Sequence, residues 1–317
     1  MVTRPTRSSW RRTSSVLVAA VTISSAACTG GGPPGPEGGP ERAEGTLTIA
    51  SFDFPESAVI AELYGQALAD AGYPVEILHE VGPRELLQPA LERGLVGFVP
   101  EYMGTALGFL TRRPDAASAD VNETYRALAS ELEGRGIVAL EPAPAQDANG
   151  FAVTRETAER FDLETISDLA PVAGELVFGG PPECPERPLC LQGLQDLYGL
   201  SFESFFALDA SGPVTVAALR AGEVDVALMF TTSGYLDGPE LMLLHDDREL
   251  QPAENVVPVV RADLLRRFGE GLRDVVESVS RRLTTEDLVE LNRLVSLEGL
   301  EPRAVAADWL AATGITR

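Results

Sequence analysis

Histidine and cysteine are scarce in this sequence of 317 residues, which contains two histidines and three cysteines. His79 and His245 stand far apart in the chain, and no dense cluster of His, Asp and Glu suggests a metal site. The sequence also lacks a Gly-x-Ser-x-Gly elbow, a His-Glu-x-x-His helix and a glycine-rich phosphate loop ending in Lys-Ser/Thr. These absences argue against an enzyme, and we expect neither a catalytic site nor a cofactor.

Positive charge is also in short supply, because 25 Lys and Arg stand against 48 Asp and Glu and leave a formal net charge of −23. Nucleic acids and anionic lipid surfaces attract clustered Lys and Arg, so this balance argues against both as partners. It mildly favours cationic or zwitterionic ligands. A solvated acidic surface without functional meaning gives the same balance and is the simpler explanation.

The apolar run at the N-terminus, Val16 to Ile23, is too short to span a bilayer as a permanent helix. It follows four arginines and precedes Ser25-Ala26-Ala27-Cys28, which is similar to a bacterial lipobox. We therefore expect residues 1–27 to be a signal peptide and Cys28 to become the lipidated first residue. An ordinary cleaved signal that contains a cysteine remains an alternative, and Arg11-Arg12 leaves twin-arginine export open beside Sec.

After Cys28 the chain to residue 44 consists of Gly, Pro, Glu and little else. Such a segment buries too little apolar surface to offset its ordering entropy, so we expect 28–44 to be a disordered tether. Cys184 and Cys190, separated by five residues, are the cysteines that remain. In an oxidising compartment such a pair predicts a disulfide, with two buried free thiols as the alternative.

About 270 residues remain for folding, more than one hydrophobic core usually serves, so we expect two lobes. Strand and helix patterns alternate from Thr46 to Leu140, which predicts a largely parallel sheet. Proline and glycine in residues 141–154 predict a crossing into the second lobe. We place lobe 1 at 45–148 plus 255–317 and lobe 2 at 149–254, with four helical patterns of the tail packed on lobe 1.

The most informative stretch is Gly94 to Leu107. Leu95 to Val99 predicts a short strand that ends at Pro100, because proline cannot donate a ladder hydrogen bond. The following turn carries a carboxylate, an aromatic ring, a glycine and a hydroxyl between Glu101 and Thr105, where backbone N–H groups of a starting helix are unpaired. Open α/β sheets bind small molecules at such points, although a buried Tyr and a capping Thr give the same pattern.

Several segments resemble, in order and spacing, the substrate-binding proteins of ABC importers for glycine betaine, choline and related compatible solutes. The resemblance covers about residues 46 to 315. The segments are Ala50 to Ser57, Ala61 to Leu68, Pro89 to Gly94, Pro100 to Leu107, Ile166 to Leu169, Glu183 to Tyr198 with Arg187 and Gly193, Gly222 to Val226, and Val257 to Arg261. The resemblance implies an α/β, two-lobed periplasmic-binding-protein fold of type II, with a ligand cleft between lobes joined by two crossing segments.

The resemblance also implies a function, which is binding of a quaternary ammonium or related compatible solute for an ABC importer. The partners would be this small-molecule solute and the ABC permease and ATPase subunits, with a monomer held on the extracytoplasmic face of the membrane by its lipid anchor. Two alternatives stay open. One is a receptor for a different cationic or zwitterionic solute, and the other is a cleft-based sensor without a transport role.

Four positions keep the family's site chemistry. Tyr102 and Thr105 match its site Tyr and Thr, Arg187 matches its carboxylate-binding Arg, and Phe230 stands at an aromatic position without the phenolic hydroxyl. The alternative for Arg187 is that it only pins the disulfide loop, and an isolated Phe such as Phe230 is by default a core residue.

Three positions depart from the family. Phe52 stands where many members have Lys, Asn149 (or Gly150) where some have a cage Tyr, and Glu254 where others have Tyr. Phe52 or Phe151 would have to complete the cage, unless both are core, and Glu254 would add a carboxylate, unless it is a solvated rim residue. We therefore expect weak betaine binding and a preference for a larger or more cationic solute, such as choline or a basic amino-acid derivative.

Overall fold

The computed structural model describes residues 45–113 and 116–316. The predicted signal peptide 1–27, the lipidation at Cys28 and the tether up to residue 44 lie outside these residues. Within the described part of the chain, no helix is both long and apolar enough to cross a bilayer.

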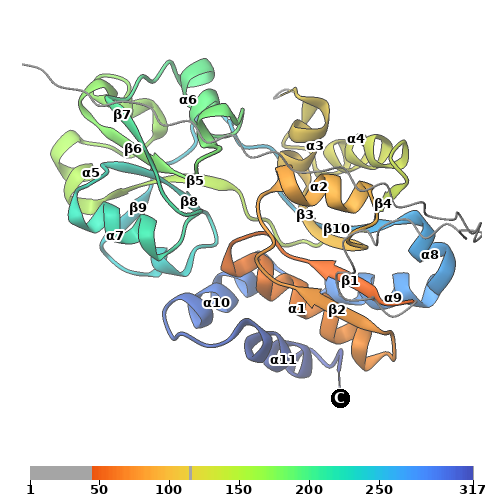
Figure 1. Cartoon of the computed structure of the whole chain (residues 1–317). Helices are drawn as coiled ribbons and strands as arrows, with labels where there is room; N and C mark the ends of the chain where they lie inside the picture. The colour runs from red at the N-terminus through yellow and green to blue at the C-terminus, as the bar shows by residue number, and fades with distance from the viewer. Residues whose placement is uncertain (1–44, 114–115, 317) are drawn as a thin grey trace, which may run out of the picture. The chain divides into compact units, whose positions relative to one another are not determined.

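The first of two five-stranded sheets has the strand order β2-β1-β3-β10-β4 (Figure 1). Its strands are β1 Leu47–Ala50, β2 Val75–Leu78, β3 Phe98–Tyr102, β4 Ile137–Ala139 and β10 Val256–Arg261. β1 runs parallel to β2 and β3, whereas β10 runs antiparallel to β3 and β4. The strands of residues 46–140, β1 to β4, therefore run in one direction, as the alternation predicted, and β10, which returns from the second sheet, enters between β3 and β4 in the opposite direction.

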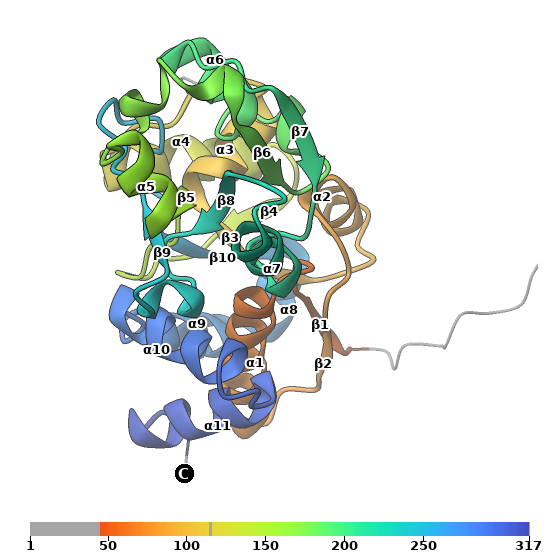
Figure 2. The ribbon, with the colours of Figure 1, turned by 90° about the vertical axis from the view of Figure 1, so that its left-hand side faces the viewer.

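Helices cover both faces of this sheet. They are α1 Pro55–Asp70, α2 Arg84–Glu92, α3 Met103–Thr111, α4 Val121–Glu133, α8 Ala262–Phe268, α9 Glu270–Ser280, α10 Thr285–Ser296 and α11 Pro302–Ala312. α1 packs against α9, α10 and α11, and both ribbon views show these helices together (Figures 1 and 2). α8 and α9 contact β10. The four tail helices thus pack on the first lobe, as the sequence predicted, and α10 also contacts the 3-10 helix η5, Gly234–Asp237, of the second lobe.

The second sheet has the order β7-β6-β8-β5-β9. Its strands are β5 Asn149–Thr154, β6 Val177–Gly180, β7 Ser204–Ala207, β8 Val226–Phe230 and β9 Leu241–Leu243, with the helices α5 Arg155–Phe161, α6 Leu191–Tyr198 and α7 Pro213–Ala221. β6 is parallel to β7 and β8, whereas β5 is antiparallel to β8 and β9. β7 and β9 were not predicted, because both are short and β7 is mostly exposed.

The two sheets repeat one topology. From one edge to the other, each sheet holds the second, the first and the third strand of its parallel set, then the crossing strand and then a final edge strand. The crossing strands are β10 in the first sheet and β5 in the second, and each is inserted antiparallel beside the third strand. Both sheets therefore bring the ends of their central strands toward the connections between the lobes.

The two connections are hydrogen-bonded to each other. Val256 N donates to Ala145 O at 2.9 Å, and Asp147 N donates to Glu254 O at 3.1 Å. Asn255 adds a side-chain bond, because its Nδ2 donates to Ala143 O at 2.9 Å. The crossings therefore form a two-stranded hinge. The strand memberships are compatible with lobe boundaries at 148/149 and 254/255, which stay a prediction.

Pro100 does not end its strand, contrary to the sequence-based expectation. β3 begins at Phe98 rather than Leu95 and continues to Tyr102, with Pro100 directly opposite Pro258 of β10. In an antiparallel pair of strands, residues that face each other alternately form two backbone hydrogen bonds with each other or none. Two facing prolines, which lack N–H groups, fit only a position without these bonds. Leu140 N donates to Pro258 O at 2.9 Å, so the carbonyl of Pro258 faces β4. Tyr102 consequently lies at a strand end.

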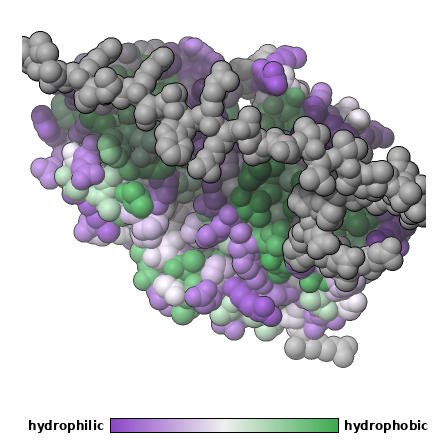
Figure 3. Space-filling model, viewed as in Figure 1, coloured by the Kyte–Doolittle hydropathy of each residue, from purple (hydrophilic) through white to green (hydrophobic). Residues whose placement is uncertain are grey.

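The surface mixes hydrophilic and hydrophobic residues on the face shown in Figure 3. Large exposed apolar side chains belong to separate elements of both lobes, among them Leu86 of α2, Phe206 of β7 and Leu297 after α10. Isolated exposed apolar residues are common on folded proteins, so we assign these no role.

Candidate functional site

A cavity of about 60 Å³ lies where the strand ends of both lobes meet the first crossing. Six of the seven predicted ligand-binding residues line it, namely Phe52, Tyr102, Thr105, Asn149, Arg187 and Phe230. A neighbouring groove of about 820 Å³ shares Arg84, Thr105, Asn149, Glu183 and Arg187 with it. The structure thus brings together residues that lie more than half the chain apart, such as Phe52 and Phe230.

Phe54 is the centre of the cavity's aromatic cluster. Its ring centroid lies 4.9 Å from that of Phe230, 5.9 Å from Phe52 and 6.0 Å from Tyr102. It is placed there by the turn between β1 and α1, since Pro55 begins the helix with the φ that its ring imposes. Sequence reasoning missed Phe54, although it lies within the segment Ala50 to Ser57 that carries the family resemblance.

Of the two rings expected to complete the cage, one reaches the cavity. Phe52 lines it, stacked on Phe54, and the Arg84 guanidinium lies 5.0 Å from its centroid. Phe151 is fully buried in the second sheet, where its ring packs against Phe178 with centroids 6.0 Å apart. Phe151 is therefore a core residue.

Glu56, at the start of α1, accepts hydrogen bonds from three parts of the chain. Its Oε1 accepts from the Tyr102 hydroxyl at 2.6 Å, and its Oε2 accepts from Thr232 Oγ1 and Asn292 Nδ2, both at 2.5 Å. Thr232 follows β8 of the second sheet, so this carboxylate links the two lobes. Burial, reinforced by the charge of Glu56, holds the pKa of Tyr102 well above its ordinary value, which keeps the phenol a neutral donor.

Asp147, in the first crossing, is a second buried carboxylate and lines the cavity. Its Oδ1 accepts from Thr231 Oγ1 and from Thr232 N, each at 3.1 Å. Burial and then the charge of Glu56 raise its pKa well above the ordinary value for Asp. Neither carboxylate was predicted as a site residue, because nothing in its local sequence pattern distinguishes it from surface acids.

The start of α3 is not an open anion site, contrary to the expectation from its sequence. Met103 N donates to Asn255 O at 3.2 Å, and Gly104 N donates to Ala253 O at 3.1 Å. Gly104 is needed because a Cβ there would lie 2.3 Å from Pro252 Cγ. The return crossing, rather than a ligand, therefore approaches this backbone.

Glu101, in the same stretch, is also occupied. Arg84 of α2 donates to both of its oxygens, from Nε at 2.9 Å and from Nη2 at 2.8 Å. Both side chains are nearly fully buried, and such a fork matches the geometry of a carboxylate. The arginine next to the cavity is thus already paired within the protein.

Glu254, the seventh predicted residue, is not among the residues that line the cavity. It is 1% exposed and lies behind Thr105, whose hydroxyl donates to its Oε1 at 2.5 Å. Its Oε2 has no hydrogen-bond partner within the described residues. Burial raises the pKa of Glu254 to about 7. It is neither a rim residue nor a cage residue, and it touches the cavity only through Thr105.

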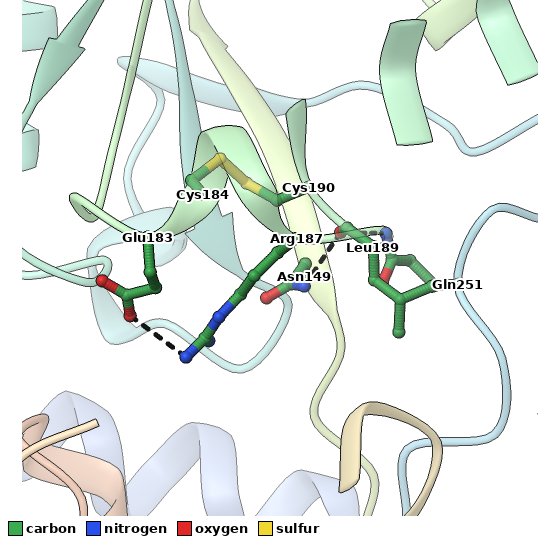
Figure 4. The surroundings of a disulfide bond; sticks show 7 residues. All are labelled: Asn149, Glu183, Cys184, Arg187, Leu189, Cys190 and Gln251. Carbon is green, nitrogen blue, oxygen red and sulfur yellow. Dashed lines mark hydrogen bonds and ion pairs between the residues drawn. A yellow bond between two sulfur atoms is a disulfide. The ribbon is translucent and has the colours of Figure 1, made fainter. Parts of the chain in front are cut away.

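Arg187 projects from a loop closed by a disulfide between Cys184 and Cys190, whose Cα atoms are 5.3 Å apart (Figure 4). Its Nη2 lies 2.8 Å from Glu85 Oε2 of α2 and 3.3 Å from Glu183 Oε1. Figure 4 shows the arginine extended toward Glu183, away from the sulfur atoms. Arg187 therefore both lines the cavity and ties the loop to α2 of the other lobe.

Asn149 anchors the far end of the same loop. Its Nδ2 donates to Leu189 O at 3.0 Å, and Gln251 Nε2 donates to the same oxygen at 3.0 Å (Figure 4). Asn149 thus positions the loop as well as lining the cavity.

Comparison with known proteins places this geometry in a family. Residues 45–312 match the model described as the substrate binding domain of ABC-type glycine betaine transport systems. The chain is 30% identical over 277 residues to a glycine-betaine-binding protein of Pseudomonas aeruginosa, covering 84% of this chain and 87% of that protein. It is 26% identical over 287 residues to the glycine betaine-binding protein YehZ of Escherichia coli, covering 88% and 94%.

The fold has solved relatives as well. The crystal structure of a glycine betaine/carnitine/choline ABC transporter protein superposes with a TM-score of 0.67 at 23% identity, covering 85% of this chain and 99% of that one. At this identity the likeness shows the fold, which is the two-lobed substrate-binding-protein fold that the sequence predicted. The chain therefore belongs to the family of substrate-binding domains of ABC-type glycine betaine transport systems.

Proposed function

We propose that this protein binds a quaternary ammonium or related compatible solute, of the glycine betaine, choline and carnitine class, for an ABC importer. The observation that carries the proposal is the aromatic cluster, in which Phe52, Tyr102 and Phe230 surround Phe54 at the cavity. A quaternary ammonium cannot donate hydrogen bonds, and each aromatic face contributes about 0.5 to 2 kcal/mol to its binding. The site serves binding and not catalysis.

The partners follow from the family. A solute that contacts both lobes favours their closure, and a permease with its ATPase would recognise the closed form. A cleft-based sensor is the second candidate, and it needs neither subunit. Genes for a permease and an ATPase beside this one would support transport, whereas their absence would favour the sensor.

Isothermal titration calorimetry of the purified protein tests the ligand class. The panel holds glycine betaine, choline, carnitine, ectoine, proline and cationic amino acids. We expect a quaternary ammonium compound to bind with a Kd near micromolar, about −8 kcal/mol. Binding of none of the quaternary compounds would contradict the proposal.

We further propose a lipid anchor at Cys28, which holds a monomer on the extracytoplasmic face of the membrane. The lipobox-like residues ahead of Cys28 support it. Fractionation of cells that express the wild type and Cys28→Ala should show the wild type in membranes and the variant released, with globomycin blocking wild-type processing. A variant that stays with the membrane would contradict the anchor.

A further inference from the structure

Two arginines that line the cavity, Arg84 and Arg187, and the first two N–H groups of α3 already have partners within the protein. Arg84 is bound by Glu101, and Arg187 by Glu85 and Glu183. The first N–H groups of α3 are bound by carbonyls of the return crossing. A ligand carboxylate would therefore have to share each arginine with a protein carboxylate, and at the start of α3 it would have to displace a backbone carbonyl.

The buried carboxyl groups at the cavity, by contrast, lack a partner of opposite charge in the part of the chain that the structure describes. Asp147 and Glu56 are 5% and 4% exposed, and neither forms an ion pair with a cationic side chain within the described residues. Their hydrogen-bond donors there are neutral groups of Thr231, Thr232, Tyr102 and Asn292. Buried carboxylates are costly without a compensating positive charge.

A metal ion does not explain this imbalance. Among residues 45–113 and 116–316, no group of three His, Cys, Asp or Glu side chains is arranged to hold one. Asp147 instead shares its cavity with the rings of Phe54, Tyr102 and Phe230. Aromatic faces beside a carboxylate form a setting for an organic cation, whose charge both attract.

We propose that Asp147, backed by Glu56, is the group that recognises the positive charge of the ligand. The ligand would then be an organic monocation without a carboxylate, of the choline type, rather than a zwitterion such as betaine. This inference rests on the function proposed above and deepens it, because it names the residue and the charge class. It also moves the specificity-determining carboxylate from Glu254, which lies behind Thr105, to Asp147.

The physical difference between the two ligand types lies at the end remote from the ammonium group. Both carry a trimethylammonium group that the rings and Asp147 would hold. Choline ends in a hydroxyl, which can hydrogen-bond without disturbing an ion pair. Betaine ends in a carboxylate, which would share Arg187 with Glu85 and Glu183 and would be repelled by an ionised Asp147.

Calorimetric titration with choline, betaine and 3,3-dimethylbutanol, the neutral isostere of choline, tests the inference. The wild type should bind choline at least about tenfold more tightly than betaine, a difference of about 1.4 kcal/mol, and the neutral isostere more weakly still. Asp147→Asn keeps the side-chain shape and an acceptor oxygen. It should weaken choline binding about tenfold or more and leave the isostere within about twofold.

The matched control is Asp196→Asn. Asp196 is exposed on α6 and outside the residues that line the cavity, so this variant loses the same formal charge and should keep wild-type affinities. Should Asp147→Asn fail to fold by circular dichroism, the wild-type comparison of choline with its neutral isostere still tests the inference without a variant. Equal affinities of the wild type for the two compounds would overturn the role of a charged group at the cavity.

The outcomes separate the two proposals. If no quaternary compound binds the wild type, the proposed function itself fails. If choline binds with equal affinity to the wild type and Asp147→Asn, or if the wild type binds betaine more tightly than choline, the function stands and the role of Asp147 is overturned.

Discussion

Glu254 carries a buried carboxylate with one oxygen that lacks a hydrogen-bond partner within the described residues. Burial disfavours its charged form and raises its pKa from the ordinary 4.5 to about 7. The folded protein therefore holds this proton more tightly than the unfolded chain does. The stability that protonation contributes is complete below about pH 4.5 and is lost as the pH rises through about 7.

Glu254→Gln should remove this dependence on pH. Between acidic and mildly alkaline pH, the wild type should lose up to about 3 kcal/mol more of its free energy of unfolding than the variant loses. Urea denaturation of both proteins below and above pH 7 measures it. An equal difference between them at both pH values would show that Glu254 titrates normally in the fold.

Phe54 supplies a second prediction at this scale. Since its ring contacts those of Phe52, Tyr102 and Phe230, Phe54→Ala should weaken binding of a quaternary ammonium ligand about 3- to 30-fold. Calorimetry with the ligand found in the panel measures this. Phe206→Ala, which truncates a half-exposed ring on β7, is the matched control and should bind normally. Equal affinity of Phe54→Ala and the wild type would remove Phe54 from the site.

Among the structural elements, the loop that carries Arg187 depends most on its covalent closure. It begins with the short 3-10 helix η4, Cys184–Glu186, and ends at α6. It reaches α2 of the other lobe through the Arg187–Glu85 ion pair, which is partly exposed and by itself contributes little. The disulfide therefore determines where Arg187 stands.

Replacement of both cysteines, Cys184→Ser with Cys190→Ser, should lower the free energy of unfolding by about 2 kcal/mol, because the loop then gains freedom in the unfolded chain. Denaturant titration measures this, and the wild type treated with reductant should lose the same amount. Unchanged stability in both experiments would indicate that the loop is held by its hydrogen bonds to Leu189 instead.

For the whole molecule, the excess of acidic residues bears on how a ligand arrives. The formal net charge of −23 attracts a cation over a distance set by the Debye length, about 10 Å at 0.1 M salt and 3 Å at 1 M. Stopped-flow measurements should show the association rate of choline falling severalfold between about 0.01 M and 1 M salt. Betaine, which has no net charge, is the control and should change little. Equal salt dependence of the two would contradict electrostatic steering.

Local patterns predicted much of this molecule. The sequence showed four helical patterns in its tail, and the structure has the helices α8, α9, α10 and α11 there. The family resemblance named Tyr102, Thr105 and Phe230, which the cavity brings together. In these cases the chemistry depends on residue type and short-range spacing, which a sequence shows directly.

The tertiary structure decided which charged groups line the cavity and which of them are paired within the protein. Glu254 and Asp147 both occur in the crossings, yet the fold buries Glu254 behind Thr105 and places Asp147 on the cavity, beside Glu56 at the start of α1. Contacts between different segments likewise supply the acceptors that bind Arg84, Arg187 and the first N–H groups of α3. The sequence by itself determined the family, most of the elements of both lobes and three of the aromatic residues at the cavity, Phe52, Tyr102 and Phe230. Only the fold decided which carboxylate lines the cavity, since that depends on long-range packing and not on any local pattern.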